Sequence, residues 1–182
     1  MLMVWFITLM LSLGAGDALR LCPEAVDVHQ ARYAQKGWAH PGRTLERLAV
    51  CSATCLSART HGIEADLAVA MVFVESKMLC DAVSSAGCIG PAQIQPKVFC
   101  NPDRPGGDPA HCAGCFAQLD RGVSHLAELR ATKDRITALC IYATGRTRGC
   151  SESAFSFGGS KLYSLVTLEL RQRLKRRWRS PG

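Results

Sequence analysis

The apolar and polar positions along this chain predict helices rather than strands. An unbroken apolar run extends from Leu67 to Val74, and a helix that is apolar all round is typical of a buried element. Glu64 and Asp66 precede this run, where carboxylates favour the positive end of the helix dipole. We therefore expect a central, buried helix that begins near Glu64.

Further helices follow from the same spacing. Thr44 is expected to cap one of them. Within that helix, Cys51 and Cys55 are four residues apart and face one side, so each must bond elsewhere or pack as a small hydrophobe. The pattern predicts a mostly α domain over 19–150, then a linker and a basic helix within 151–182. Helices are expected over 23–35, 44–59, 116–131, from about 134, and over 161–178.

The first eighteen residues are typical of an export signal. Met1 to Leu13 is almost wholly apolar, and Gly16 and Ala18 occupy the −3 and −1 positions of a cleavage site. The apolar stretch is shorter than the roughly 20 residues of a membrane span. We expect a signal peptide over 1–18 and a periplasmic or extracellular protein, with an uncleaved anchor as the alternative.

Ten cysteines agree with export, because an even number behind a signal peptide indicates disulfides. Cys112 and Cys115 form one CxxC motif, whereas zinc needs four ligands, usually from two such motifs. Disulfides are therefore expected and no metal is. Local pairs such as Cys140 with Cys150, or Cys100 with Cys112 or Cys115, are candidates, and the pairing stays open.

The net charge of +7 is concentrated near the C-terminus, with six basic residues from Arg171 to Arg179. Such a run is either a solvated tail or a contact for an anionic wall or membrane surface. Nucleic-acid binding is not expected, because the basic residues form one terminal run in an exported chain. Trp178 is the only aromatic residue among them. The apolar content of 48% excludes a disordered protein.

Glu75 follows the buried run and falls on the same helical stripe as Ala68, Met71 and Val72. Apolar surroundings and the negative end of the helix dipole both disfavour an ionised carboxylate, so a raised pKa is expected. A raised pKa suits a general acid near neutral pH. The alternative is a surface glutamate at a fraying helix end.

Three segments, at Glu75-Ser76, within 84–96 and at 141–145, occur in an order that resembles the signature of the soluble lytic transglycosylases, glycoside hydrolase family 23. The family has Glu-Ser on a helix, then S-x-x-G-A-x-G-L-M-Q-[LIVM]-x-P, and later A-Y-N-x-G. Glu75-Ser76 matches the first segment, and 141–145 (Ile-Tyr-Ala-Thr-Gly) is a degraded third. The resemblance covers about 63–145 and implies a lysozyme-like fold, goose-type or transglycosylase-like. The second segment matches at Ser84, Gly87, Gly90, Gln93, Ile94 and Pro96.

The resemblance implies cleavage of the MurNAc-β-1,4-GlcNAc bond of peptidoglycan, with formation of 1,6-anhydroMurNAc and without a cofactor. Glu75 would be the general acid and then the base. Gln93 and Tyr142 could instead be a structural amide and a core tyrosine. The residues expected to bind substrate are Ser76, Ser84, Gly90, Gln93 and Tyr142.

The chain departs from the family at several positions, which indicates a divergent member. Pro91-Ala92 replaces Leu-Met, Ala143 replaces Asn, and Cys88, expected to be held by a disulfide, replaces Ala. Alternatives are a goose-type lysozyme-like hydrolase and a non-catalytic, peptidoglycan-binding assembly component. Expected partners are glycan strands and an envelope-spanning secretion or conjugation apparatus that needs the wall opened locally.

Overall fold

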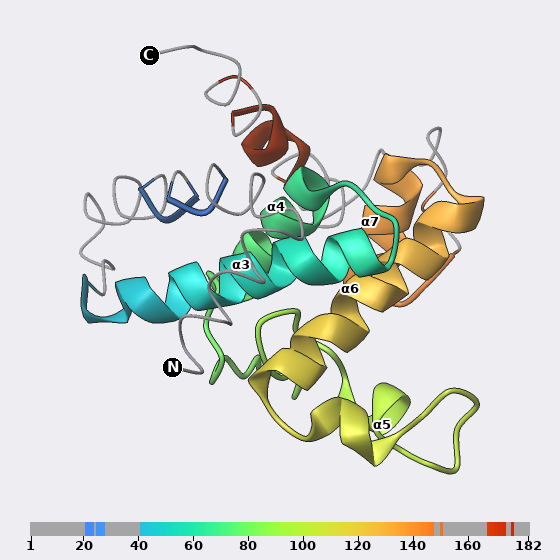
Figure 1. Cartoon of the computed structure of the whole chain (residues 1–182). Helices are drawn as coiled ribbons and strands as arrows, with labels where there is room; N and C mark the ends of the chain where they lie inside the picture. Colours follow the sequence, from blue (N-terminus) through green and yellow to red (C-terminus); the bar gives the residue numbers. More distant parts are fainter. Residues whose placement is uncertain are drawn as a thin grey trace.

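The computed structural model describes residues 21–23, 25–27, 41–147, 150, 167–173 and 176. This part of the chain is mostly helical (Figure 1), with two isolated β-bridges. The predicted mostly α class is therefore confirmed. The elements between 41 and 144 are η1 (Pro41–Arg43), α3 (Thr44–Thr60), α4 (Ala65–Ser76), α5 (Pro96–Phe99), η2 (Pro109–Cys112), α6 (Cys115–Thr132) and α7 (Arg135–Thr144).

Helix α4 is the centre of the core, as its apolar run predicts. Every residue from Leu67 to Val72 is completely buried. Helix α3 packs against both α4 and α6, and α6 packs against α7. Each large apolar side chain buried in this way stabilises the folded state by roughly 1.5–3 kcal/mol. The helix that carries Glu75 is therefore firmly held in the core.

The helix ends differ in part from the sequence prediction. Thr44 is the first residue of α3 and not its cap, because the 3-10 turn Pro41–Arg43 leads directly into the helix and puts Arg43 in the capping position. At the start of α7, Asp134 is a true cap, and its carboxylate accepts hydrogen bonds from the backbone N–H groups of Ile136 and Thr137.

The described C-terminal residues, 167–173 and 176, are helical and partly packed on the core. Arg171 is buried and its Nε lies 2.7 Å from the carboxylate of buried Asp66. Arg173 pairs with Glu169. The start of the basic run is thus not a solvated tail, and its remaining basic residues, apart from Arg176, lie outside the described part of the chain.

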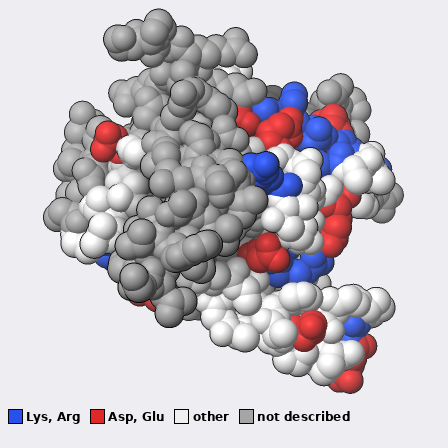
Figure 2. All heavy atoms as spheres, viewed as in Figure 1, with Lys and Arg blue, Asp and Glu red and all other residues white. Residues whose placement is uncertain are grey.

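Charges of both signs lie interspersed on the described part of the face in Figure 2. No helix in the described ranges is long and apolar enough to cross a bilayer. The expected signal peptide over 1–18 lies outside those ranges.

Four disulfides connect the described elements, which is compatible with the predicted export. The local pairs Cys140–Cys150 and Cys100–Cys112 are confirmed. The other two join residues far apart in the sequence, Cys22 with Cys51 and Cys80 with Cys115. The expectation for Cys88 is wrong, because all four disulfides join other cysteines and Cys88 keeps its thiol.

Candidate active site

Glu75 lies half-buried in the last turn of α4, immediately before an unusual backbone turn. Lys77 and Met78 follow it with φ angles of 61° and 63°. Left-handed backbone is uncommon for residues other than glycine, and two such residues in succession are rarer still. Residues held in this region cluster at functional sites, so the turn after Glu75 indicates a functional position.

The surrounding structure fixes this turn from several directions. Lys77 reaches back with Nζ to donate to the carbonyl of Val74 at 2.9 Å, and buried Arg47 donates from Nε to the carbonyl of Lys77 at 3.3 Å. The N–H of Cys80 donates to the Glu46 carboxylate at 2.9 Å. The end of α4 therefore cannot fray, and the position of Glu75 is set by α3 as well as by its own helix.

Ser76 is buried, and its hydroxyl serves the helix end. It donates to the carbonyl of Val72 at 3.3 Å and accepts from the N–H of Leu79 at 3.2 Å. A substrate contact for Ser76 stays a prediction, since in this structure the side chain faces its own backbone.

The loop after α4 folds back on itself in two narrow turns. Backbone bridges join Val83 to Ile89 and Ile89 to Ile94. The half-buried Ser84 closes the first turn, because its Oγ accepts from the N–H of Cys88 at 3.0 Å. The structure thus gives Ser84 a structural role, and a contact with sugar remains a prediction.

Gln93 and Gly90 hold the second turn. Gln93 has a φ of 52°, and its Nε2 donates to the carbonyls of Ala82 at 3.1 Å and Gly90 at 2.9 Å. The donor end of this amide therefore binds the loop. Gly90 has a φ of 74°, and a Cβ there would lie 2.1 Å from Oε1 of Gln118. The close approach that needs a glycine at this position is made by a protein side chain.

Tyr142 of α7 binds this loop. Its hydroxyl donates to the carbonyl of Ala92 at 2.7 Å. Burial, first, and the negative charge of Glu75, second, raise the pKa of the Tyr142 hydroxyl well above its usual value of 10.0, against an opposing effect of Arg121. Tyr142 thus joins α7 to the glycine loop, and the negative charge of Glu75 acts on the same hydroxyl group.

The hydrogen bond to Ala92 limits what Tyr142 can do for Glu75. A phenol has one donor hydrogen and two acceptor lone pairs. Its hydrogen is bound to the Ala92 carbonyl, so toward any other group the oxygen offers lone pairs. A lone pair accepts a hydrogen bond only from a protonated acid, so Tyr142 cannot donate to a carboxylate while it binds Ala92.

Helix α6 approaches this site at Gly122, which has no side chain. A Cβ on Gly122 would lie 2.3 Å from the Cβ of Ala92 and 2.7 Å from the Tyr142 hydroxyl. Ala92 is completely buried in this contact, so the larger methionine of the family pattern would not fit at 92. Pro91 is buried beside it, whereas Ala143 is exposed. The departures at 91 and 92 therefore belong to packing inside the protein.

A row of rings and charges next to Tyr142 was missed by the sequence analysis. The His125 ring lies 5.7 Å from that of Tyr142 and 5.0 Å from that of Phe99, and Cζ of Arg121 lies 4.9 Å from the Phe99 ring. Glu128 binds Arg121 at 2.7 Å. Burial lowers the pKa of His125, against the opposing effect of Glu128. The signal was the helical spacing of 121, 125 and 128 on α6.

Comparison of the chain with models of protein families, with curated proteins and with solved structures gives no match. Function is therefore inferred from the residues and from the geometry that joins them.

Proposed function

We propose that the chain is an exported lytic transglycosylase that cleaves the MurNAc-β-1,4-GlcNAc bond of peptidoglycan, with Glu75 as its general acid and base. The proposed fold is lysozyme-like, and the proposed products end in 1,6-anhydroMurNAc. One observation carries the proposal. The Tyr142 hydroxyl donates a hydrogen bond to the carbonyl of Ala92, and the charge of Glu75 raises the pKa of the same hydroxyl, so residues of all three motif segments act on one group.

The backbone around this point supports a catalytic role. Lys77, Met78 and Gln93 are the non-glycine residues with positive φ in the described ranges. Lys77 and Met78 directly follow the first motif segment, and Gln93 belongs to the second. Each such residue costs of order 1–3 kcal/mol and persists only where the surrounding structure enforces it. Two of the three directly follow the half-buried Glu75, which supports a functional role for this turn.

Glu75 would perform both proton transfers of the reaction. As an acid, it protonates the oxygen that leaves C1 of the muramic acid residue. As a base, it then takes the proton of the C6 hydroxyl, whose oxygen closes on C1 to give the anhydro ring. Tyr142 would assist the first step by accepting a hydrogen bond from the protonated carboxyl group. One carboxyl group in two roles replaces the two carboxylates of most glycosidases.

The test is mass spectrometry of the muropeptides released from purified sacculi by the full chain. We expect products that are lighter by one water than those of a hydrolase. Glu75→Gln keeps the size of the side chain but removes its proton chemistry, and it should lower the rate by roughly 10²–10⁴-fold. Exposed Glu169 offers the matched control, and Glu169→Gln should retain the parental rate.

The outcomes separate the candidate functions. Hydrated products that disappear with Glu75→Gln would indicate a goose-type lysozyme-like hydrolase with the same acid. Sacculus binding without any released product would indicate a binding component. Release by Glu75→Gln at the parental rate would show that another residue is the acid. Service to a secretion or conjugation apparatus stays a prediction that this assay does not address.

A further inference from the structure

We propose that Cys22, Cys51 and Cys55 form a thiol–disulfide exchange site, in which one disulfide moves between the pairs Cys22–Cys51 and Cys22–Cys55. The structure holds the first pair. Cys55 lies outside the four disulfides and is buried. This inference is independent of the proposed transglycosylase activity.

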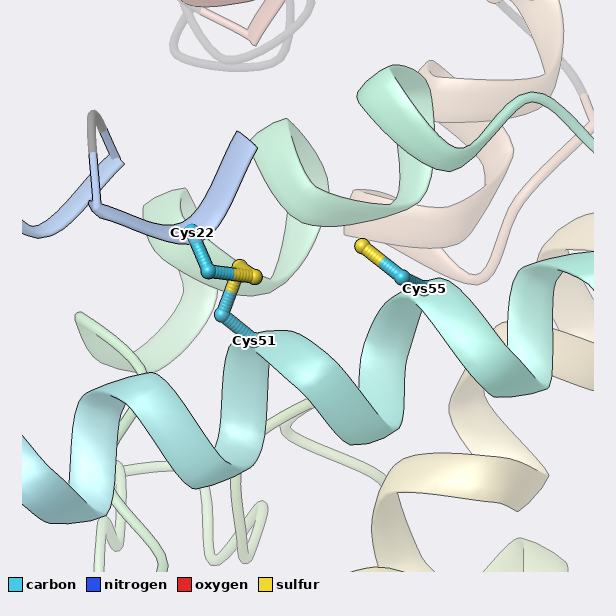
Figure 3. A group of neighbouring side chains, drawn as sticks. All are labelled: Cys22, Cys51 and Cys55. Atoms are coloured by element: carbon cyan, nitrogen blue, oxygen red, sulfur yellow. A yellow bond between two sulfur atoms is a disulfide. The ribbon is translucent and has the colours of Figure 1, made fainter. Parts of the chain in front are cut away.

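The three sulfur atoms are gathered in the core. All Sγ atoms lie within 4.8 Å of one another, and the three side chains are at most 6% exposed. Figure 3 shows Cys55 one turn further along α3 than Cys51, with its Sγ on the side of the helix where the disulfide lies. A thiol held this close to a disulfide satisfies the access that exchange requires.

The same cluster has the spacing of a metal site, but the disulfide already uses two of the three sulfurs. A thiolate ligand set would need that bond to be reduced first. Exchange needs no reductant, because a disulfide and a thiol are present both before and after the reaction. The observed state of the cluster therefore favours exchange over metal binding.

Only one alternative pair fits the geometry of α3. Cβ atoms four residues apart on a helix are about 5–6 Å from each other, whereas a disulfide needs roughly 3.5–4.5 Å. A Cys51–Cys55 bond would therefore distort the helix. Cys22 lies on a different segment and is not held to this helical spacing, so the new bond is Cys22–Cys55.

The exchange step is balanced within the protein. The Cys55 thiolate attacks Sγ of Cys22, the Cys22–Cys51 bond breaks, and its electron pair passes to Sγ of Cys51. Cys51 takes up the proton that Cys55 lost. No sulfur is oxidised or reduced overall. Sγ of Cys22 lies within 4.8 Å of Sγ of Cys55 and would have to approach it to about 2.05 Å, the length of an S–S bond.

The test follows the thiol that is left over. The full chain is incubated in native buffer for minutes to hours, which is the timescale of uncatalysed disulfide rearrangement. Samples are quenched with acid and unfolded with excess N-ethylmaleimide, and the labelled cysteine is located by fragment ions. We expect label on Cys55 and, because the two pairings are in equilibrium, a share of label on Cys51 as well.

Three variants provide controls. Cys55→Ser should reduce the label on Cys51 to background, because the attacking sulfur is gone. Cys88→Ser removes the other cysteine outside the disulfides and should leave the Cys51 signal unchanged. Cys51→Ser should form Cys22–Cys55 directly, and intact Cys80–Cys115, Cys100–Cys112 and Cys140–Cys150 bonds would show that this variant folds.

Label on Cys55 and Cys88 but never on Cys51 in the parental chain would overturn the proposal, whatever pair Cys51→Ser forms. Label on Cys51 that persists in Cys55→Ser would also overturn it, because incomplete oxidation would then be the source. Loss of the Cys51 label in Cys88→Ser would assign the attack to Cys88 and equally reject the site.

Discussion

Gly122 lies where α6, the loop after α4 and Tyr142 meet, and Gly122→Ala tests that meeting point directly. The added Cβ would lie 2.3 Å from the Cβ of Ala92 and 2.7 Å from the Tyr142 hydroxyl. Neither neighbour is the end of a loose side chain. Ala92 is attached to a buried loop, and the hydroxyl is bound to the Ala92 carbonyl.

The expected loss of stability is a balance of three effects. In an open helix, glycine to alanine gains up to about 1 kcal/mol. At Gly122, the loop must retreat by about 1 Å to restore a normal contact near 3.5 Å, and overpacking of this kind costs about 1–3 kcal/mol. Weakening of the Tyr142 hydrogen bond adds about 1 kcal/mol. We expect a net destabilisation of about 1–3 kcal/mol.

Urea unfolding of the oxidised protein, followed by circular dichroism, measures this change. Gly42→Ala is the control, because nothing lies within 4 Å of a Cβ at Gly42, and its midpoint should move little. The direction in which the urea midpoint shifts decides the test. If Gly122→Ala unfolds at the same or a higher urea concentration than the parent, α6 does not press on the loop and Tyr142 as described.

Three further changes test other parts of the structure. Gly90→Ala should destabilise the protein more than Gly87→Ala does in the same urea assay. Both glycines have φ near +75°, but only at Gly90 would a Cβ meet a side chain. Equal losses of stability would reject that contact. Arg171→Met should lower the free energy of unfolding by about 3–5 kcal/mol, because it leaves the Asp66 carboxylate buried alone. Adding Asp66→Leu should recover most of that loss, and a double variant as unstable as Arg171→Met would show that the pair is not buried. The raised pKa of Tyr142 means that the native state keeps a proton that the unfolded state loses, so stability should fall as the pH rises above about 10. Tyr142→Phe should flatten that fall in an alkaline unfolding series, and an unchanged slope would assign the fall to other groups.

The sequence predicted those elements that depend on neighbouring residues. The apolar run of α4, the helix over α6 and the start of α7 at Asp134 all follow from spacing within one element. The local disulfides Cys140–Cys150 and Cys100–Cys112 follow in the same way. Long-range pairs could not be predicted, because the joining of residues 22 and 51, or 80 and 115, depends on how separate helices pack.

The candidate site shows the same division. The motif located Glu75, the loop and Tyr142, but not which group each side chain binds. Gln93 and Ser84 were expected to face sugar, and their hydrogen bonds in this structure run to the loop's own backbone. Whether a polar side chain satisfies its own turn or faces outward depends on φ at single residues, such as 52° at Gln93, and spacing does not determine that angle.

The bracing of the α4 end explains why the chain can hold Glu75 at a conformationally costly position. Two successive left-handed residues would relax into a frayed helix end if only α4 held them. Here Arg47 and Glu46 of α3 bind the turn from one side, and the Cys80–Cys115 disulfide joins its far end to the start of α6. A disulfide that closes a loop of this length contributes roughly 2–4 kcal/mol, which is comparable to the cost of the two strained residues. The long-range disulfide, which spacing could not predict, is thus one of the parts that fix the residue that the motif identified most clearly.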